Sequence, residues 1–285
     1  EELCQLFPRT GQLPLLQLEP TEARAGIRRP FNAGVLLSGG QAPGGHNVIA
    51  AVYDALKAHH AASRLYGFLM GPGGLLKHQF IELHKDLIDR YRNSGGFDMI
   101  GSDRTKIERV EDFEKVITIA RRLDLSALII IGGDDSATNA ALLAEYCAEQ
   151  GEKLCVVGCP KTIDGDLKNR YIETSFGFDT CAKVYSELVG NIQRDCYSAK
   201  KYWHFIKLMG RSASHLTLEC ALQTQPTMAI ISEEVQARGL TLDDIVQAIA
   251  DTVVARYDSG YPFGVVLLPE GLIEFVPRMK HLIGE

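Results

Sequence analysis

Short apolar runs alternate with amphipathic stretches along the chain from about residue 33 onward. Between two such runs, Phe113, Val116, Ile117, Ala120 and Leu123 keep the i, i+3, i+4, i+7 spacing of an amphipathic helix. Strands that alternate with helices predict an α/β fold with mostly parallel sheets flanked by helices, in Rossmann-type layers. The predicted strands cover residues 33–37, 65–69, 127–131, 154–158, 203–209, 228–231 and 264–268.

Other local signals place further elements between these strands. Residues 48–56 fit one helix face, and 71–74 read as a glycine turn. Thr241 and Asp244 predict a capping box at the start of a second long helix. Residues 1–32 are rich in Pro, Gly and Arg and lack a sustained period, so we interpret them as an N-terminal extension packed on or trailing from the fold.

Composition excludes several classes of protein. The chain has 285 residues, of which 46% are hydrophobic and 23% charged, and its formal net charge of −6 argues against a general nucleic-acid binder. No apolar run reaches the roughly 18 residues of a membrane span, and the first residues lack a signal-peptide pattern. The seven cysteines are odd in number and scattered, which favours buried thiols in a reducing compartment over a disulfide framework or zinc site. We therefore expect a cytoplasmic protein.

Three predicted strands end in residues suited to phosphate chemistry. Ser38-Gly39-Gly40, with Gly44 and Gly45, follows the first strand, and glycine N–H groups before a helix can approach an anion closely. This loop matches neither common nucleotide motif, and a plain tight turn is an equal alternative.

A second glycine turn, Gly132-Gly133, precedes Asp134 and Asp135 at a predicted helix start. One interpretation is that Asp134 is an N-cap. The other is that Asp134 holds a hard cation together with phosphate oxygens, which would relieve its repulsion with Asp135.

The third strand end carries Lys161, Thr162, Asp164 and Asp166. In an extended loop the two carboxylates would point to the same side, where one could accept a hydroxyl proton and the other could orient the site or help to hold metal. Lys161 could neutralise charge on a transferred phosphoryl group. In isolation, a solvated Asp-Gly-Asp turn is the slightly favoured alternative.

Basic residues near glycines could complete an anion site. Arg211 leaves an apolar strand directly into a glycine turn, and Arg104 follows Gly101 closely. Lys200 can also be explained as a complement to a helix C-terminus. His204 and His215 lie in apolar surroundings, so we expect them to pack in the core or to support other site residues rather than to react.

Together these motifs resemble the phosphofructokinase family, and in particular its long, pyrophosphate-dependent branch. The resemblance runs from about Asn32 to the end of the chain, through SGGQAPGGHN, GGDDS, PKTIDGD, TSFGFDT, KYWHF, LMGRSASH, LECALQTQP and LLPEG. It implies a phosphofructokinase-like fold and reversible, magnesium-dependent phosphoryl transfer from pyrophosphate to the 1-hydroxyl of fructose 6-phosphate. It also implies a homo- or hetero-oligomer, without nucleic-acid or membrane partners.

The resemblance further implies roles for particular residues. Asp134 would hold Mg²⁺, and Asp164 would accept the proton of the sugar hydroxyl. The catalytic set would be Asp164, Lys161, Asp135, Thr162 and Asp166, and the donor contacts would come from Gly39, Gly40, Arg104, Gly133 and Asp135. Sugar-phosphate contacts would come from Thr162, Asp164, Lys201, Tyr202, Met209, Gly210, Arg211 and Glu270, with Lys201 and Tyr202 offered to a neighbouring subunit.

Donor choice depends on two positions. ATP-using members typically have glycine where this chain has Asp135, and many have glycine where it has Lys161. The Asp135 carboxylate would occupy the place of the ATP α-phosphate, and Lys161 would suit a pyrophosphate leaving group. An ATP-dependent enzyme is the alternative, as is a noncatalytic or inactive truncated subunit, although plant-type regulatory subunits lose the residues that match Lys161 and Asp164.

The resemblance also has departures. Its pattern continues well beyond Glu285, so we expect residues 33–200 to form the phosphoryl-donor and catalytic domain and 201–285 to begin an incomplete sugar-phosphate-binding domain. Gly73 stands where the pattern usually has serine, and Asp103 stands where it usually has glycine.

Overall fold

The computed structural model describes residues 5–14, 29–276 and 279. Its packing divides the chain into two compact units, Glu1–Lys161 and Thr162–Glu285. The sequence predicts a division of the chain by function, with boundaries after residues 32 and 200. Those functional boundaries stay a prediction.

The first unit is built on one sheet of six strands in the order β3-β2-β1-β5-β6, with β4 also paired to β1. All pairs are parallel except the antiparallel β2–β3 pair, which confirms the predicted α/β class. Because β1, β5 and β6 are parallel neighbours, their carboxyl ends meet at one edge of the sheet. The strands are β1 (Asn32–Ser38), β2 (Arg64–Phe68), β3 (Phe80–Glu82), β4 (Ser102–Asp103), β5 (Leu125–Gly132) and β6 (Cys155–Pro160).

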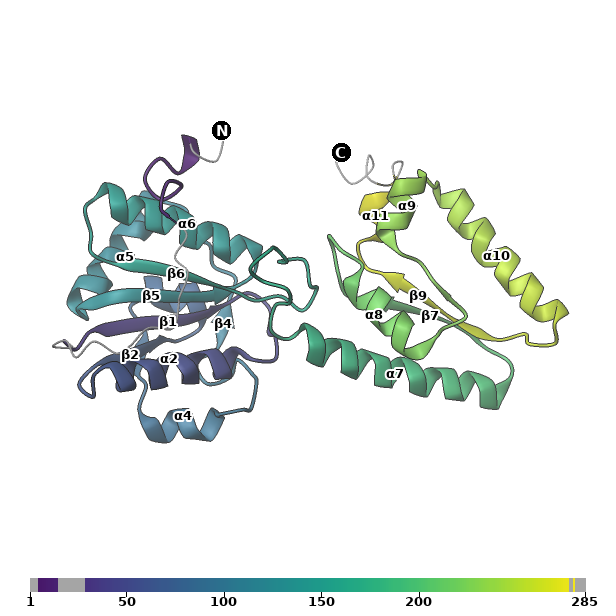
Figure 1. The fold of residues 1–285 in the computed structure, drawn as a ribbon, viewed down its shortest axis with the longest axis horizontal. Helices are drawn as coiled ribbons and strands as arrows, with labels where there is room; N and C mark the ends of the chain where they lie inside the picture. Colours follow the sequence, from purple (N-terminus) through teal and green to yellow (C-terminus); the bar gives the residue numbers. More distant parts are fainter. Residues whose placement is uncertain (1–4, 15–28, 277–278, 280–285) are drawn as a thin grey trace. The chain divides into compact units, whose positions relative to one another are not determined.

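Helices cover both faces of this sheet, with α2 and α4 on one side and α5 and α6 on the other (Figure 1). Fully buried side chains such as Leu36, Phe68 and Leu128 from the strands pack with Val116 of α5 and Leu143 of α6. The helices are α2 (Gly45–His59), α3 (Gly71–Leu76), α4 (Lys85–Tyr91), α5 (Val110–Arg122) and α6 (Asp134–Glu149).

The predicted glycine turn at residues 71–74 is wrong, because these residues begin the short helix α3. Pro72 is compatible with this position because the N–H that proline lacks would be unpaired in a first helical turn. Met70 precedes the helix in a left-handed conformation with φ of 54°.

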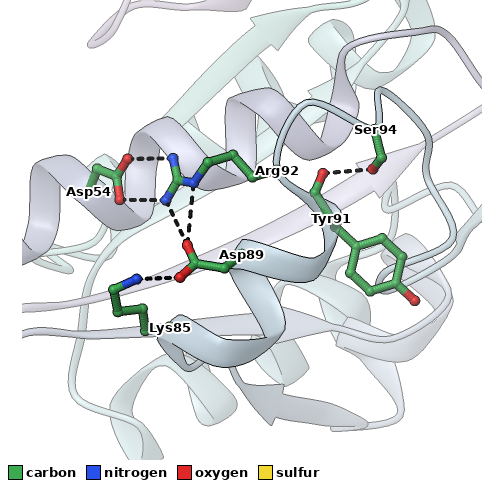
Figure 2. A network of polar contacts seen from close by, with 6 residues as sticks. All are labelled: Asp54, Lys85, Asp89, Tyr91, Arg92 and Ser94. Carbon is green, nitrogen blue, oxygen red and sulfur yellow. Dashed lines mark hydrogen bonds and ion pairs between the residues drawn. The ribbon is translucent and has the colours of Figure 1, made fainter.

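Ion pairs fasten α4 to α2 (Figure 2). The Arg92 guanidinium lies 2.7 Å from one oxygen of Asp54 and also pairs with Asp89, which in turn pairs with Lys85. Because these side chains are largely exposed, the network contributes little to stability. Ser94 follows and donates a hydrogen bond to the carbonyl of Tyr91, which ends α4 (Figure 2).

The described part of the N-terminal extension packs on α6. The Glu145 carboxylate accepts hydrogen bonds from the backbone N–H groups of Arg9 and Thr10, at 2.9 and 2.8 Å, and from the Thr10 hydroxyl at 2.6 Å. Glu145 is buried, so these bonds are what satisfies its carboxylate.

The apolar run at 154–158 is typical of a buried strand, and β6 is instead an edge strand. Within the described residues β6 pairs with β5 alone, and Val157 is 43% exposed. Alanines of α6 face β6 and leave a cavity of about 210 Å³ lined by apolar and small residues. Apolar runs at the edge and the centre of a parallel sheet look alike in sequence, which explains the error.

The second unit has a smaller parallel sheet, ordered β7-β9-β8. Val265 and Leu267 pack with Val189 of α7 and Cys220 of α8, while Ile245 of α10 lies in a separate cluster. The strands are β7 (Trp203–Leu208), β8 (Met228–Ala229) and β9 (Gly264–Pro269), and the helices are α7 (Phe178–Ala199), α8 (His215–Thr224), α9 (Ser232–Arg238), α10 (Leu242–Asp258) and α11 (Leu272–Phe275).

Two local predictions have different outcomes in this unit. Thr241 and Asp244 form the predicted capping box of α10. The run at 228–231 is only partly a strand, because β8 ends at Ala229.

Two properties of the described residues bear on function. None of the helices that the structure describes is long and apolar enough to cross a membrane. Free thiols are found at all six cysteines in the described ranges, and four of them are buried.

Candidate active site

Two cations flank the glycine turn that follows β1 in the first unit. The Lys161 ammonium donates a hydrogen bond to the Gly40 carbonyl at 2.8 Å. It also lies 3.4 Å from where a Cβ atom of Gly39 would stand, and the Arg104 guanidinium lies 3.6 Å from the corresponding position of Gly40. Gly39 has φ of 83°, a conformation that favours glycine, and both cations lie within van der Waals distance of the turn.

Lys161 is held in place by the sheet. It directly follows β6, and its backbone N–H donates to the Gly132 carbonyl at the end of β5 at 2.8 Å. Its residue is only 8% exposed, which is unusual for lysine and limits the directions in which its ammonium can point. The structure therefore brings Gly39, Gly40, Arg104 and Lys161 together, whereas their roles stay a prediction.

Asp134 and Asp135 occupy the first turn of α6, and the interpretation of Asp134 as an N-cap is wrong. Gly133 is the N-cap residue, and no side chain caps this helix end. Both carboxylates are exposed, and the helix dipole favours negative charge at this position. Gly133 also lies beside Lys161, whose carbonyl is 3.5 Å from where a Gly133 Cβ would stand.

The side chains near Asp134 fit a magnesium ion that takes most of its ligands from a bound phosphate compound and from water. No group of three or more His, Cys, Asp or Glu side chains in the described ranges is arranged to hold a metal ion. Mg²⁺ typically uses one or two protein carboxylates and takes its remaining ligands from phosphate oxygens and water. Asp134, an exposed carboxylate directly after Gly132 and Gly133, meets that requirement.

The second unit holds the loop from Thr162 to Asp166. Gly165 has φ of 74°, a left-handed conformation that favours glycine, so the loop bends and is not extended as the i, i+2 argument assumed. Three side chains fasten it. Ser175 donates to the Thr162 carbonyl at 2.7 Å, Ser212 donates to Asp166 at 3.0 Å, and a nitrogen of His215 lies 2.9 Å from the Gly165 carbonyl.

The environment of Asp164 favours its protonated form. Burial raises the pKa of the Asp164 carboxyl, and the negative charges of Asp166 and Glu270 raise it further. The Arg211 backbone N–H and guanidinium act in the opposite direction and only partly offset these effects. A carboxylate with a raised pKa is a better proton acceptor near neutral pH, which is typical of a general base.

Arg211 and Glu270 lie together because the ends of β7 and β9 are joined. The Glu270 N–H donates to the Leu208 carbonyl at 2.8 Å, and the Gly271 N–H donates to the Gly210 carbonyl at 2.9 Å. A Cβ atom on Gly271 would overlap the Arg211 carbonyl, so glycine is needed for this approach. The structure thus groups Gly210, Arg211 and Glu270 with Asp164, and the exposed Met209 immediately precedes them.

Lys201 and Tyr202 are not part of this group. They precede β7, whereas Arg211 follows its other end, and the Lys201 ammonium lies 5.6 Å from the centre of the Tyr202 ring. Tyr202 is 49% exposed. The pair is therefore placed on the surface of the second unit.

The sequence from residue 32 to residue 283 matches the family model for phosphofructokinase. The chain belongs to the phosphofructokinase family. This confirms the family that the motifs indicated, and the fold and the strand-end residues are those on which that resemblance was based.

Curated relatives of this phosphofructokinase chain carry names that specify a donor. Pyrophosphate–fructose 6-phosphate 1-phosphotransferase from Porphyromonas gingivalis is 64% identical over 285 residues, and the protein of that name from Entamoeba histolytica is 55% identical. The matches cover all of this chain and 52% of either relative. The beta subunit from Solanum tuberosum is 51% identical, with 50% of its length covered. The chain thus spans about half the length of these relatives.

Solved structures share the fold at lower identity. A crystal structure of phosphofructokinase from Pichia pastoris in the T-state has a TM-score of 0.72 at 21% identity, covering 96% of this chain and 30% of that one. A pyrophosphate-dependent phosphofructokinase from Marinobacter aquaeolei has a TM-score of 0.70 at 21% identity, covering 90% of this chain and 66% of its own.

Sequence reasoning missed several residues that support the site of this phosphofructokinase chain. Ser175 and Ser212 lie inside the quoted motifs, but nothing in the motif letters shows that they bind the loop around Asp164. Ser102 and Asp103 contact Gly39, and only the pairing of β4 with β1 could have revealed this. His215 was expected in the core or in support of other site residues, and it has the second of these roles, from an exposed position.

Proposed function

We propose that this chain carries the donor site and the catalytic loop of a magnesium-dependent phosphotransferase that uses pyrophosphate. The reaction transfers a phosphoryl group reversibly to the 1-hydroxyl of fructose 6-phosphate and gives fructose 1,6-bisphosphate and phosphate. The observation that carries the proposal is the buried Lys161 ammonium, held 2.8 Å from the Gly40 carbonyl beside an open glycine turn. The names of the relatives at 51–64% identity support pyrophosphate as the donor.

Pyrophosphate suits this donor site better than ATP does. Asp135 is exposed in the first turn of α6, and its negative charge would repel the α-phosphate of a nucleotide bound there. Lys161 and Arg104 supply two positive charges close to Gly39 and Gly40, which is enough to bind a compact dianion or trianion. The site thus disfavours a nucleotide and neutralises a small anion.

The transfer step needs a base and a stabilised leaving group. Asp164 accepts the proton of the sugar 1-hydroxyl as its oxygen attacks the nearer phosphorus of pyrophosphate. The bond from that phosphorus to the bridging oxygen breaks, and Lys161 stabilises the charge that develops on the departing phosphate. Magnesium bound through Asp134 would neutralise phosphate oxygens. Thr162 and Asp166 hold the loop in position, and with it the carboxylate of Asp164.

The sugar phosphate is bound in the second unit. We assign its contacts to Met209, Gly210, Arg211 and Glu270, with the guanidinium of Arg211 as the anion ligand. The carboxylate of Glu270 suits a sugar hydroxyl, which can donate to it.

We also propose that the protein acts as an oligomer in the cytoplasm. Relatives from Solanum tuberosum and Arabidopsis thaliana are named as beta and alpha subunits. Lys201 and Tyr202, exposed before β7, are available to a neighbouring subunit.

A coupled assay tests the donor. The complete natural polypeptide is assayed with fructose 6-phosphate and magnesium, first with pyrophosphate and then with ATP, and we expect turnover with pyrophosphate alone. Turnover with ATP alone would establish the ATP-dependent alternative. Absence of turnover with both donors would establish the noncatalytic alternative.

Calorimetric titration of the 285-residue chain separates binding from turnover. We expect it to bind magnesium pyrophosphate, because Gly39, Gly40, Asp134 and Lys161 are all present in the first unit. We expect the same chain to turn over fructose 6-phosphate poorly, because it spans about half the length of its relatives and would position the sugar less well. Loss of such positioning can raise the barrier by about 7–11 kcal/mol. Full turnover by this chain would contradict the second expectation.

A further inference from the structure

The short strand β4 holds Gly39 by both of its backbone polar groups. The Gly39 N–H donates to the Asp103 carbonyl at 2.8 Å, and the Ser102 hydroxyl donates to the Gly39 carbonyl at 3.0 Å. The Gly39 N–H is therefore occupied within the protein. Gly39 shapes the turn, and contact with an anion falls to Gly40 and to the cations beside it.

The Asp103 side chain fixes the segment that makes these bonds. One of its oxygens accepts from the N–H groups of Gly73 and Thr105, each at 3.2 Å, and the other accepts from the Thr105 hydroxyl at 2.5 Å. The Gly73 N–H belongs to the first turn of α3, so Asp103 ties β4 to that helix. Arg104 lies between Asp103 and Thr105, and the hydrogen bonds from Thr105 to the Asp103 carboxylate close a tight turn around it.

We propose that Asp103 is a positioning residue of the donor site, and that it acts by holding the Gly39–Gly40 turn and Arg104 in the geometry that binds the donor. This inference rests on the proposed function for the nature of the bound anion. Asp103 acts through hydrogen bonds that it accepts and not through its charge, because a negative charge next to Arg104 opposes the binding of pyrophosphate. Without the carboxylate, the turn and the guanidinium lose their common support.

The glycine at position 73 is the counterpart of this carboxylate. A Cβ atom on Gly73 would overlap an oxygen of Asp103 and would lie 3.1 Å from the Thr105 hydroxyl. The carboxylate and a side chain at position 73 therefore exclude each other. The two departures from the family pattern, Gly73 and Asp103, are thus one feature of the structure.

Three variants of the 285-residue chain separate position from charge. Asp103→Asn keeps the shape and an acceptor for Gly73 and Thr105 while it removes the charge, whereas Asp103→Gly removes both. Glu114→Gln, on the exposed side of α5, is the matched control for loss of one negative charge. Titration with magnesium pyrophosphate should show affinity about tenfold weaker for Asp103→Gly, since it loses several hydrogen bonds of modest net value. Asp103→Asn and the control should stay within about threefold of the wild type.

Amide hydrogen exchange supplies a readout that needs no ligand. The Gly39 amide should be protected in the wild type and in Asp103→Asn, and its protection should fall at least about tenfold in Asp103→Gly. If no variant or wild-type chain binds pyrophosphate, the proposed function fails, and the exchange result still decides whether Asp103 supports the turn. Full protection of Gly39 together with wild-type affinity in Asp103→Gly would overturn the inference.

A double substitution tests the link to Gly73. Gly73→Ser alone should weaken binding, because the serine side chain displaces the carboxylate. Combined with Asp103→Gly, the same serine should cost less than it does alone, since the space is then free. Additive effects of the two substitutions would show that the positions act independently and would overturn this part of the inference.

Discussion

The substitution Asp164→Asn should remove turnover and, at the same time, stabilise the fold at neutral pH. Asparagine has the same shape as aspartate but cannot accept the proton of the sugar hydroxyl. A positioned base contributes about 10²–10⁴-fold, so turnover should fall by that factor, equivalent to about 2.7–5.4 kcal/mol of barrier. The KM for each substrate should change little, because the side chain keeps its volume.

The effect on stability follows from the environment of Asp164. Burial and the charges of Asp166 and Glu270 raise the pKa of the Asp164 carboxyl above its usual value of 3.8, so the folded state holds the proton more tightly than the unfolded state does. Ionised Asp164 therefore destabilises the fold at pH values above its folded pKa. As the pH falls through the folded pKa toward 3.8, the wild type regains this stability. Asp164→Asn should be the more stable protein at pH 7, and the difference should vanish at low pH.

The two effects are measured separately. Turnover is measured with the complete natural polypeptide and pyrophosphate, and stability by urea unfolding of the 285-residue chain at pH 7 and near pH 3.5. Glu173→Gln, an exposed carboxylate of the same unit, is the control and should change neither quantity. Near-wild-type turnover of Asp164→Asn would remove Asp164 from the mechanism. Loss of turnover with lower stability at pH 7 would refute the electrostatic reasoning.

Further predictions concern donor choice and pH. Asp135→Gly should allow measurable ATP-dependent turnover in the coupled assay, and Lys161→Gly should depress turnover with pyrophosphate; unchanged donor preference in both variants would refute our account of specificity. His46 is buried, accepts from the Met99 N–H at 3.0 Å and lies 2.8 Å from the Ser94 hydroxyl, and burial lowers its pKa despite the nearby Asp98. The unfolding free energy should therefore decrease as the pH falls from about 6.5 through the folded pKa, and thermal melts of His46→Gln should lack that decrease; an identical pH dependence in both proteins would contradict this.

The sequence predicts correctly that the three strand-end turns lie close together, because the signals for these turns are local. Each of the turns at Gly39, Gly133 and Lys161 directly follows an apolar run, and parallel strands bring such ends to one edge of a sheet. Strand order is not needed for that inference. It requires only that the three strands be parallel members of one sheet.

The errors arise where structure depends on contacts between distant residues. The exposure of β6 depends on its place at the end of the sheet, which its apolar run does not encode. The helix at Gly71 depends in part on Asp103, thirty residues away, which binds the N–H of Gly73. The bend at Gly165 is supported by His215, fifty residues later. In each case the local pattern allows two structures, and a non-local contact selects one.

The boundary between the compact units falls inside the PKTIDGD motif, between Lys161 and Thr162. Lys161 is fixed by the first unit, through Gly40 and Gly132, whereas Thr162 is bound by Ser175 of the second. One loop therefore carries two residues with different proposed roles, Lys161 and Asp164. The position of each depends on the packing of a different unit. Substitutions at Lys161 should act mainly on the dependence of turnover on pyrophosphate concentration. Substitutions at Asp164 should act mainly on the rate of phosphoryl transfer. The motif alone does not predict such a kinetic separation, because its residues are contiguous in sequence. The separation follows from the structure, in which the first unit fixes Lys161 and the second unit holds the loop that carries Asp164.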